Sequence, residues 1–189
     1  MIEDKILGQY KKLKESKVRD AFKTRQVRDL LITELTDEFW IVTACDSDGG
    51  IGPKERDTIY SSGYELGRFG ARVPLMETLA SGAVPILVVD TLSVEMEPTG
   101  KEIIRGVRDE VIDAGMNGSS TVTSSTEDNV ETVQTGMGVT VVSLVAKKDF
   151  KPGSSAEDDI VICVGFPKSA PEYKVAYDDP EIANLQCVS

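Results

Sequence analysis

The stretch of sequence that most constrains the fold reads Gly67-Arg68-Phe-Gly-Ala-Arg72-Val-Pro74-Leu-Met-Glu77-Thr-Leu-Ala-Ser-Gly-Ala-Val-Pro85. Apolar side chains recur every three or four residues between positions 58 and 83, and this spacing predicts a helix. Pro74 predicts a break in that helix or the start of a new first turn. Pro85 then opens a short buried strand over residues 86–89, where a missing amide is tolerated. The centre of the chain is therefore a helix followed directly by a strand.

Towards the N-terminus, residues 2–13 have helical apolar spacing, and two β-rich runs follow at 27–35 and 39–45. Residues 36–38 join these runs as a hairpin-like connection. Asp29 is then early on one predicted strand and Asp46 lies just past the end of the other, so the two carboxylates can approach each other. Residues 46–53 form a glycine-rich loop, and the backbone at Gly49 and Gly50 can come close to a phosphate or an ion.

Towards the C-terminus, Thr99-Gly-Lys-Glu102 predicts a capping box that opens a helix ending at Gly115. A Ser/Thr-rich segment at 118–129 leads into a β-branched run at 133–145, which places Asp128 at a turn between β segments. A linker at 147–159 precedes a predicted strand at 160–164 and an irregular tail. This order predicts an α+β fold in which helices cover one face of a mixed, mainly antiparallel sheet. The expected organisation is an N-terminal helix and basic segment at 1–24, a core domain at 25–149, and a linker with a short tail at 150–189.

The composition restricts the chemistry. The chain has 189 residues and no histidine, so general acid-base catalysis and metal binding must use other side chains, and oxygen ligands for hard cations remain. The net charge of −11 disfavours a nucleic-acid-binding surface, and the basic residues, Lys17 and Arg19 among them, concentrate in the first 28 positions. No apolar stretch is long enough to span a membrane and the start has no export signal, which predicts a cytoplasmic protein. Three cysteines without metal spacing suggest reduced thiols.

Four acidic residues lie beside turns or Gly/Ser-rich segments: Asp29, Asp46, Glu77 and Asp128. Carboxylates in such positions are typical of a Mg²⁺–nucleotide site, although each one alone is more simply explained as a turn or cap residue. Only the convergence of the whole set would favour a metal site.

These motifs resemble those of the N-terminal domain of the aminoimidazole ribonucleotide synthase-like (PurM-like) superfamily, which includes thiamine-monophosphate kinase. The resemblance covers about residues 25–147 and rests on Arg28-Asp29, Cys45-Asp46-Ser47, the segment Pro74–Pro85 and the turn Ser125-Thr-Glu-Asp128-Asn129. Two departures from the family pattern are Pro74 in place of an asparagine and Glu77 in place of an aspartate. A third is Thr126-Glu127 in place of a diglycine. The sequence of residues Gly67–Glu77 is most similar to that of the α-ribazole kinase-like branch, which is linked to cobalamin lower-ligand salvage.

The resemblance implies ATP-dependent phosphoryl transfer to a small hydroxyl-bearing metabolite, with Mg²⁺ held by Asp29, Asp46, Glu77 and Asp128. It also implies nucleotide contacts from Thr126 and Asn129 of the turn, together with the backbone of Gly49 and Gly50. Arg68 and Arg72, one helical turn apart, would clamp phosphate, although they can equally be solvated helix charges.

In this superfamily a second, glycine-rich domain usually covers the cleft, and the tail of this sequence is too short to replace it. The alternatives are a single-domain variant, a fragment of a longer protein, or a chain that binds nucleotide without turnover. N-terminal domains of the superfamily pair about a two-fold axis, which implies a homodimer whose sheets complete a barrel. Two other functions remain open. One is a non-catalytic nucleotide-binding or scaffold domain, and the other is an ATP-dependent cyclo-ligase of the aminoimidazole ribonucleotide synthase type.

Overall fold

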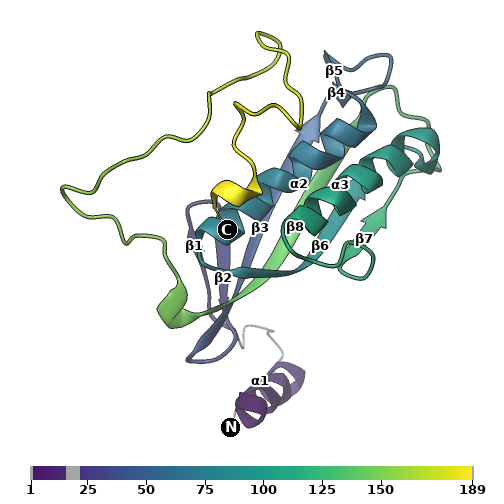
Figure 1. The fold of residues 1–189 in the computed structure, drawn as a ribbon. Coiled ribbons are helices and arrows are strands. Elements are labelled where there is room, and N and C mark those ends of the chain that lie inside the picture. The colour runs from purple at the N-terminus through teal and green to yellow at the C-terminus, as the bar shows by residue number, and fades with distance from the viewer. Residues whose placement is uncertain (1, 16–21, 189) are drawn as a thin grey trace.

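The protein is described here by a computed structural model that covers residues 2–15 and 22–188. Lys17 and Arg19 of the predicted basic segment lie outside these residues. Helix α1 (Ile2–Glu15) lies apart from the rest, beyond the turn that joins two strands (Figure 1). The Lys5 ammonium lies 3.3 Å from the Asp37 carboxylate of that turn. The predicted N-terminal helix is therefore confirmed.

The body of the molecule is an open six-stranded sheet covered on one face by two helices (Figure 1). The strands, in their order across the sheet, are β1 (Thr24–Val27), β2 (Leu30–Glu34), β3 (Phe39–Gly49), β8 (Gly136–Ala146), β6 (Val84–Leu92) and β7 (Val122–Ser125). Every pair is antiparallel except β6 with β7. The predicted α+β class and mixed, mainly antiparallel sheet are confirmed. A single copy forms an open sheet and not a barrel.

The central strands β3 and β8 pair along their whole length, from Phe39 opposite Ala146 to Gly49 opposite Gly136. Their side chains alternate in burial, so that Trp40, Val42 and Ala44 of β3 are buried in a second, smaller core cluster with Ala83 and Phe150, while the residues between them are more exposed. A two-residue period of this kind is what a sheet with one covered face requires.

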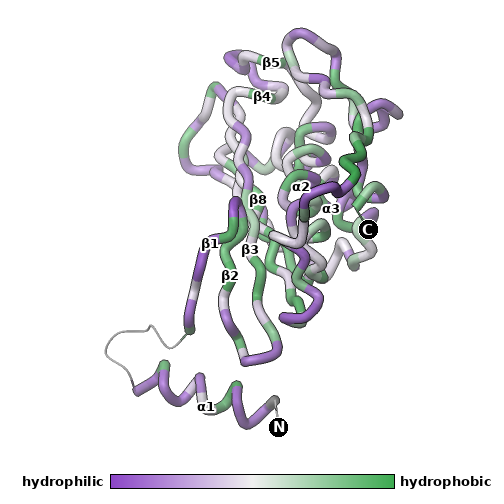
Figure 2. The backbone as a smooth tube through the Cα atoms, turned by 90° about the vertical axis from the view of Figure 1, so that its left-hand side faces the viewer, coloured by the Kyte–Doolittle hydropathy of each residue, from purple (hydrophilic) through white to green (hydrophobic). Residues whose placement is uncertain are grey.

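The helical layer consists of α2 (Gly63–Ala80) and α3 (Lys101–Asp113), and both helices lie on the same side of the sheet (Figure 2). Leu66 and Leu75 of α2 pack with Val107 of α3 and Val141 of β8 in the larger core cluster. The two helices come very close, because a Cβ atom on Gly67 would collide with the carbonyl of Ile103. Glycine at this crossing lets the two backbones touch.

Helix α2 corrects two details of the sequence prediction. It begins at Gly63 and not at 58, because β5 (Ile59–Tyr60) pairs with β4 (Ile51–Gly52), and Ser62 caps the helix by accepting a hydrogen bond from the Glu65 amide. Pro74 lies inside the helix without breaking it. An internal proline costs a helix about 3 kcal/mol. The fully buried side chains on either side of it, Ala71 and Leu75, offset that cost by packing into the core.

Three further strand and cap predictions need correction. The run 27–35 is two strands, because Arg28 and Asp29 form a turn between β1 and β2, whereas Asp46 lies within β3 and not past its end. The Thr99 hydroxyl does not cap α3. It donates to the Glu95 carboxylate at 2.6 Å, since a short π-helical turn (Met96–Gly100) leads into the helix.

The predicted strand at 160–164 is wrong. No described part of the chain offers this segment a partner strand, and Ile160, Val161 and Ile162 are strongly exposed. After the short helical turn Lys147–Asp149, the chain runs away from the helices in a long loop and then returns over α2 (Figure 1). Leu185, in the last short turn (Leu185–Cys187), is buried in the larger core cluster. Among the described residues no helix is long and apolar enough to cross a membrane.

Candidate functional site

Two of the predicted carboxylates meet where β2 begins. Asp29 lies in the two-residue turn before β2, which Arg28 closes with a left-handed backbone (φ 53°). The register pairs Leu31 of β2 with Thr43 of β3, and this brings the turn level with the middle of β3, where Asp46 lies. Asp46 shares the helix-covered face of β3 with Ala44 and is half-buried. Sheet register therefore brings the first two acidic residues together.

Glu77 completes this group from the helical layer. Its pKa is raised, first by burial and then by the negative charges of Asp29 and Asp46, so Glu77 lies close enough to both aspartates for their charges to act on it. The buried Oε2 atom of Glu77 has no hydrogen-bond partner. Asp29 and Glu77 also line a cavity of about 470 Å³ at the end of α2. We call Asp29, Asp46 and Glu77 the carboxylate group.

Asp128 does not belong to this group. It lies in the loop between β7 and β8, where its Oδ1 accepts a hydrogen bond from the Met96 amide at 2.9 Å and its Oδ2 accepts one from the Thr126 hydroxyl at 2.8 Å. These bonds lower the pKa of Asp128. Its pocket is a different one, shared with Lys54 and Glu95. The predicted nucleotide contacts Thr126 and Asn129 lie in the same loop, so the structure separates this loop from the carboxylate group.

The carboxylate group fits a hard divalent cation in charge and in donor type. It offers only oxygen ligands, it contains an unpartnered buried oxygen, and a bound cation would offset the two negative charges that act on Glu77. Within residues 2–15 and 22–188, however, no three acidic or cysteine side chains already stand at ligating distance from one common point. Metal binding would therefore require side-chain rotation or oxygens supplied by the nucleotide.

Asp48 is a neighbour of this group that the sequence prediction missed. It lies two residues after Asp46 on the same face of β3, and burial, followed by the charge of Asp46, raises its pKa. It lies beneath Gly70 of α2, where a Cβ atom would be 3.1 Å from its Oδ2. Asp48 also lines a second cavity of about 700 Å³ whose walls are the start of α2, the β4–β5 region and tail residues 168–175. The sequence carries a signal for Asp48, because continuing the two-residue alternation of β3 beyond Cys45 puts Asp46 and Asp48 on the same face.

Gly49 ends β3 and Gly50 makes the next turn with a left-handed backbone (φ 71°). The Gly50 amide donates to the Thr135 carbonyl at 2.8 Å, and Gly50 also accepts the amide of Thr58. These backbone groups are used within the fold, and phosphate binding by this loop stays a prediction.

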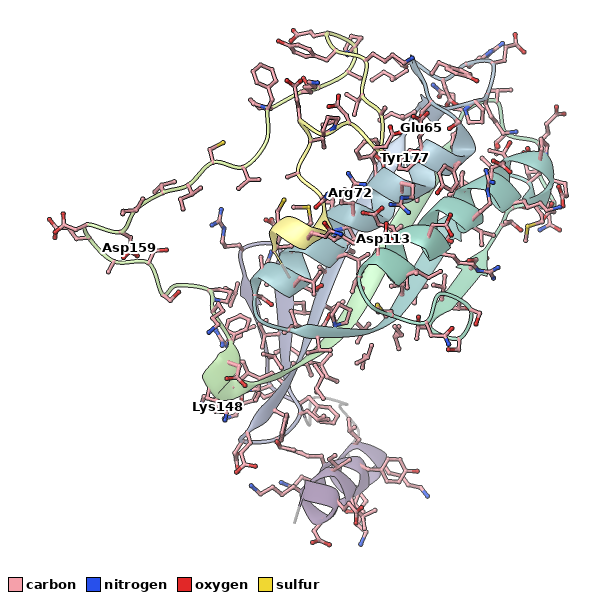
Figure 3. All side chains as sticks on the ribbon, viewed as in Figure 1. Glu65, Arg72, Asp113, Lys148, Asp159 and Tyr177 are labelled. Carbon is pink, nitrogen blue, oxygen red and sulfur yellow. The ribbon has the colours of Figure 1, made fainter. Side chains whose placement is uncertain are left out.

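Arg68 and Arg72 are both buried, and Arg72 lies close to Tyr177 of the returning tail (Figure 3). Both pair with the buried Glu110 of α3 at 2.7 Å, and Arg68 also pairs with Asp113. Arg72 donates to the Tyr177 carbonyl at 3.1 Å, and the Tyr177 ring lies over Arg68. Phosphate would have to displace these partners, so the phosphate clamp stays a prediction that the observed contacts do not favour.

Comparison with solved structures finds this fold elsewhere. PurL from T. maritima, in a complex with ADP, matches with a TM-score of 0.50 and 18% identity over 67% of this chain. The chain has the fold of a PurM-like N-terminal domain. Thiamine monophosphate kinases from Aquifex aeolicus and Stenotrophomonas maltophilia K279a also match, each over 76% of the chain, with TM-scores of 0.46 and 0.44 and identities of 15% and 14%.

At these identities the similarity establishes the PurM-like fold and no more. The aligned part of the chain spans 42% of the Aquifex kinase and 20% of T. maritima PurL. No family model and no curated protein sequence matches the chain.

Proposed function

We propose that this chain binds ATP with Mg²⁺ and transfers the γ-phosphoryl group to a small hydroxyl-bearing metabolite, in the manner of an α-ribazole kinase. The observation that carries the proposal is the convergence of Asp29, Asp46 and Glu77, from a turn, a strand and a helix, beside a cavity. Placing the negative charges of Asp29 and Asp46 beside Glu77 costs stability, so the arrangement is better explained by a function than by folding.

In this proposal Asp29, Asp46 and Glu77 hold Mg²⁺, which supplies neutralisation of the polyphosphate charge that develops in phosphoryl transfer. The protein's own contribution is positioning. Asp46 is fixed by the β3–β8 ladder and Glu77 by the packing of α2, so two of the three oxygen donors stand on rigid elements. The unpartnered Oε2 of Glu77 would be one of the oxygen ligands of the cation.

The acceptor occupies the larger cavity, which Asp48 connects to the carboxylate group along one face of β3. Ile51, Leu66 and Phe69 give this cavity an apolar floor, while Ser61 and Glu65 supply polar atoms at its rim. A compact ring compound with hydroxyl groups suits such a lining. Asp48 is placed to accept a hydrogen bond from the acceptor hydroxyl and to orient it towards the phosphate.

The test is titration of Mg²⁺–ATP into the purified chain, followed by a screen for ADP release over nucleosides and other small alcohols. Glu77→Gln keeps the shape of the side chain and removes its charge, so Mg²⁺-dependent nucleotide affinity is expected to fall about tenfold or more. Glu38→Gln, an exposed change at the β2–β3 turn, is the control and is expected to leave affinity unchanged. Absence of binding at millimolar Mg²⁺–ATP would contradict the proposal.

A second candidate function is nucleotide binding without turnover. The placement of Asp128 favours it, because one of the four predicted ligands lies in another pocket within a single copy. Nucleotide binding that depends on Glu77, with no ADP formed with any acceptor, would identify this function.

A further inference from the structure

The segment Lys151–Ser155, expected from the sequence to be a linker, forms part of the lining of the cavity that holds two of the acidic residues. Its residues line the same cavity of about 470 Å³ as Asp29 and Glu77. The Lys151 amide donates to the Ser81 carbonyl at 2.9 Å, which ties the segment to the end of α2. A Cβ atom on Gly82 would collide with the carbonyl of Asp149, so the chain is pressed against the helix end. The segment is therefore a fixed wall of the cavity. We call it the 151–155 loop.

Four polar side chains that line this cavity make no ion pair or side-chain hydrogen bond within the described part of the chain. In the described part of the chain, Lys151 and Arg28 form no ion pair although Asp29 and Glu77 line the same cavity. The hydroxyl groups of Ser154 and Ser155 have no hydrogen-bond partner there either. Elsewhere on the surface, cations such as Lys101 and Arg105 pair with a carboxylate on their own helix or just before it. The cavity thus brings together two carboxylates with two cations and two hydroxyls that have no partner among the described residues.

The backbone of the loop adds to this arrangement. Gly153 has a left-handed conformation (φ 83°), and the Ser154 amide donates to the Lys151 carbonyl at 3.2 Å, so the loop is a tight turn. Tight glycine turns with adjacent lysine and serine side chains are suited to phosphate oxygens, because amide, ammonium and hydroxyl donors can reach the same group.

We propose that the 151–155 loop, together with Arg28, binds the polyphosphate chain of the nucleotide, with Lys151 as its main charged contact. A metal–polyphosphate complex contains both a cation and anionic oxygens, and the cavity offers carboxylates for the cation and basic and hydroxyl side chains for the oxygens. This inference rests on the proposed function, since the carboxylate group holds the metal while the loop holds the phosphates. The loop would add a phosphate contact outside residues 25–147, the part of the chain that carries the family resemblance.

The experiment compares Lys151→Ala with Lys148→Ala in the full chain. Lys148 is an exposed lysine three residues earlier that does not line the cavity, so it controls for loss of one positive charge. Affinity for ATP, ADP and AMP is measured by calorimetry with Mg²⁺ present, and inorganic tripolyphosphate is the probe without a nucleoside. Thermal unfolding of both variants establishes that each one is folded.

Lys151→Ala is expected to weaken ATP and tripolyphosphate binding about tenfold, the size of one lost charge-assisted hydrogen bond, and to change AMP binding little. Lys148→Ala is expected to bind all four ligands as the unmodified chain does. Equal ATP affinity in the Lys151→Ala variant would overturn the role of the loop and leave the proposed function standing. Binding of tripolyphosphate that depends on Lys151, without any preference for ATP, would instead support the loop and overturn the nucleotide function. An unmodified chain that binds neither ligand would overturn both.

Discussion

Asp90 of β6 has a fully buried carboxyl group, and only one of its two oxygens has a hydrogen-bond partner. The Ser124 hydroxyl donates to its Oδ2 at 2.9 Å, while its buried Oδ1 has no partner. Burial raises the pKa of Asp90 to about 6, against lowering effects from Ser124 and from Arg108 of α3. The group is neutral in mildly acid solution and ionised, at a cost, in neutral solution.

The pKa of Asp90 predicts a specific pH dependence of stability. Because the folded pKa of about 6 exceeds the ordinary value of 3.8, the folded state binds the proton more tightly, and stability falls as pH rises from about 4 to 6. Asp90→Asn stays neutral throughout. The variant's free energy of unfolding minus that of the unmodified chain is expected to be larger at pH 7.5 than at pH 4.5, by roughly 2 kcal/mol. Urea unfolding at the two pH values measures this difference, and Asp149→Asn, an exposed change, should show none.

The same residue-level reasoning explains how much of the candidate site the sequence could predict. Asp29, Asp46 and Glu77 were found because they stand beside turns and glycines, and the structure brings them together. Asp48 was missed because β3 continues through glycine-rich sequence that is typical of a loop. The pairing of Arg68 and Arg72 with Glu110 depends on the crossing of two helices, which no local pattern reveals.

Among the elements, the contact between α2 and α3 depends on two glycines. A Cβ atom on Gly106 of α3 would collide with the Tyr64 carbonyl of α2, just as one on Gly67 would collide with α3. The close approach also allows the Arg68 and Arg72 side chains to reach Glu110 across the contact. Helix separation would therefore loosen packing and ion pairing together.

Gly106→Ala is therefore expected to destabilise the fold, although alanine is the better helix former. Forcing the helices apart typically costs about 1 to 3 kcal/mol, which exceeds the gain in helix propensity of about 1 kcal/mol. Gly8→Ala in α1, where a Cβ atom would meet nothing within 4 Å, is the matched control and should not lower stability. Urea midpoints of the two variants give the comparison. An unchanged midpoint for Gly106→Ala would mean that the helices separate without loss.

The elements also show where sequence patterns succeed and fail. The existence of α1, α2 and α3 followed from apolar periodicity, since burial on one face is what that periodicity encodes, and the central strands followed from their β-rich composition. The run at 160–164 has equally strong strand character, yet it remains irregular, because a strand exists only where a second strand satisfies its backbone groups. Strand β7 was missed for the converse reason. Its short Ser/Thr-rich sequence is held by pairing with β6.

At the scale of the whole molecule, the face of the sheet opposite the helices is apolar and uncovered. Its side chains come from every second position of the same strands that build the core. Leu31, Val84 and Leu87 are 46%, 66% and 38% exposed, and Val142 and Leu144 lie between them. Figure 2 shows both helices on the other side of the sheet. An extended apolar sheet face of this kind is typical of an interaction surface.

We expect a second copy of the chain to cover this face, forming the homodimer that the sequence resemblance implied. A two-fold axis through the face would place each apolar strand against its equivalent, so that one surface serves both partners.

Val142→Glu puts a charge at the centre of the face, where Val142 pairs between Thr43 and Leu87, and burial of that unpaired charge would oppose association. In sedimentation velocity at micromolar concentration, the unmodified chain should be a dimer and the Val142→Glu variant a monomer with unchanged circular dichroism. Ile112→Glu tests whether any exposed apolar residue has this effect, since Ile112 is 54% exposed on α3, and this variant should remain a dimer. A monomeric unmodified chain, or a Val142→Glu variant that still dimerises, would show that the open face is not the site of self-association.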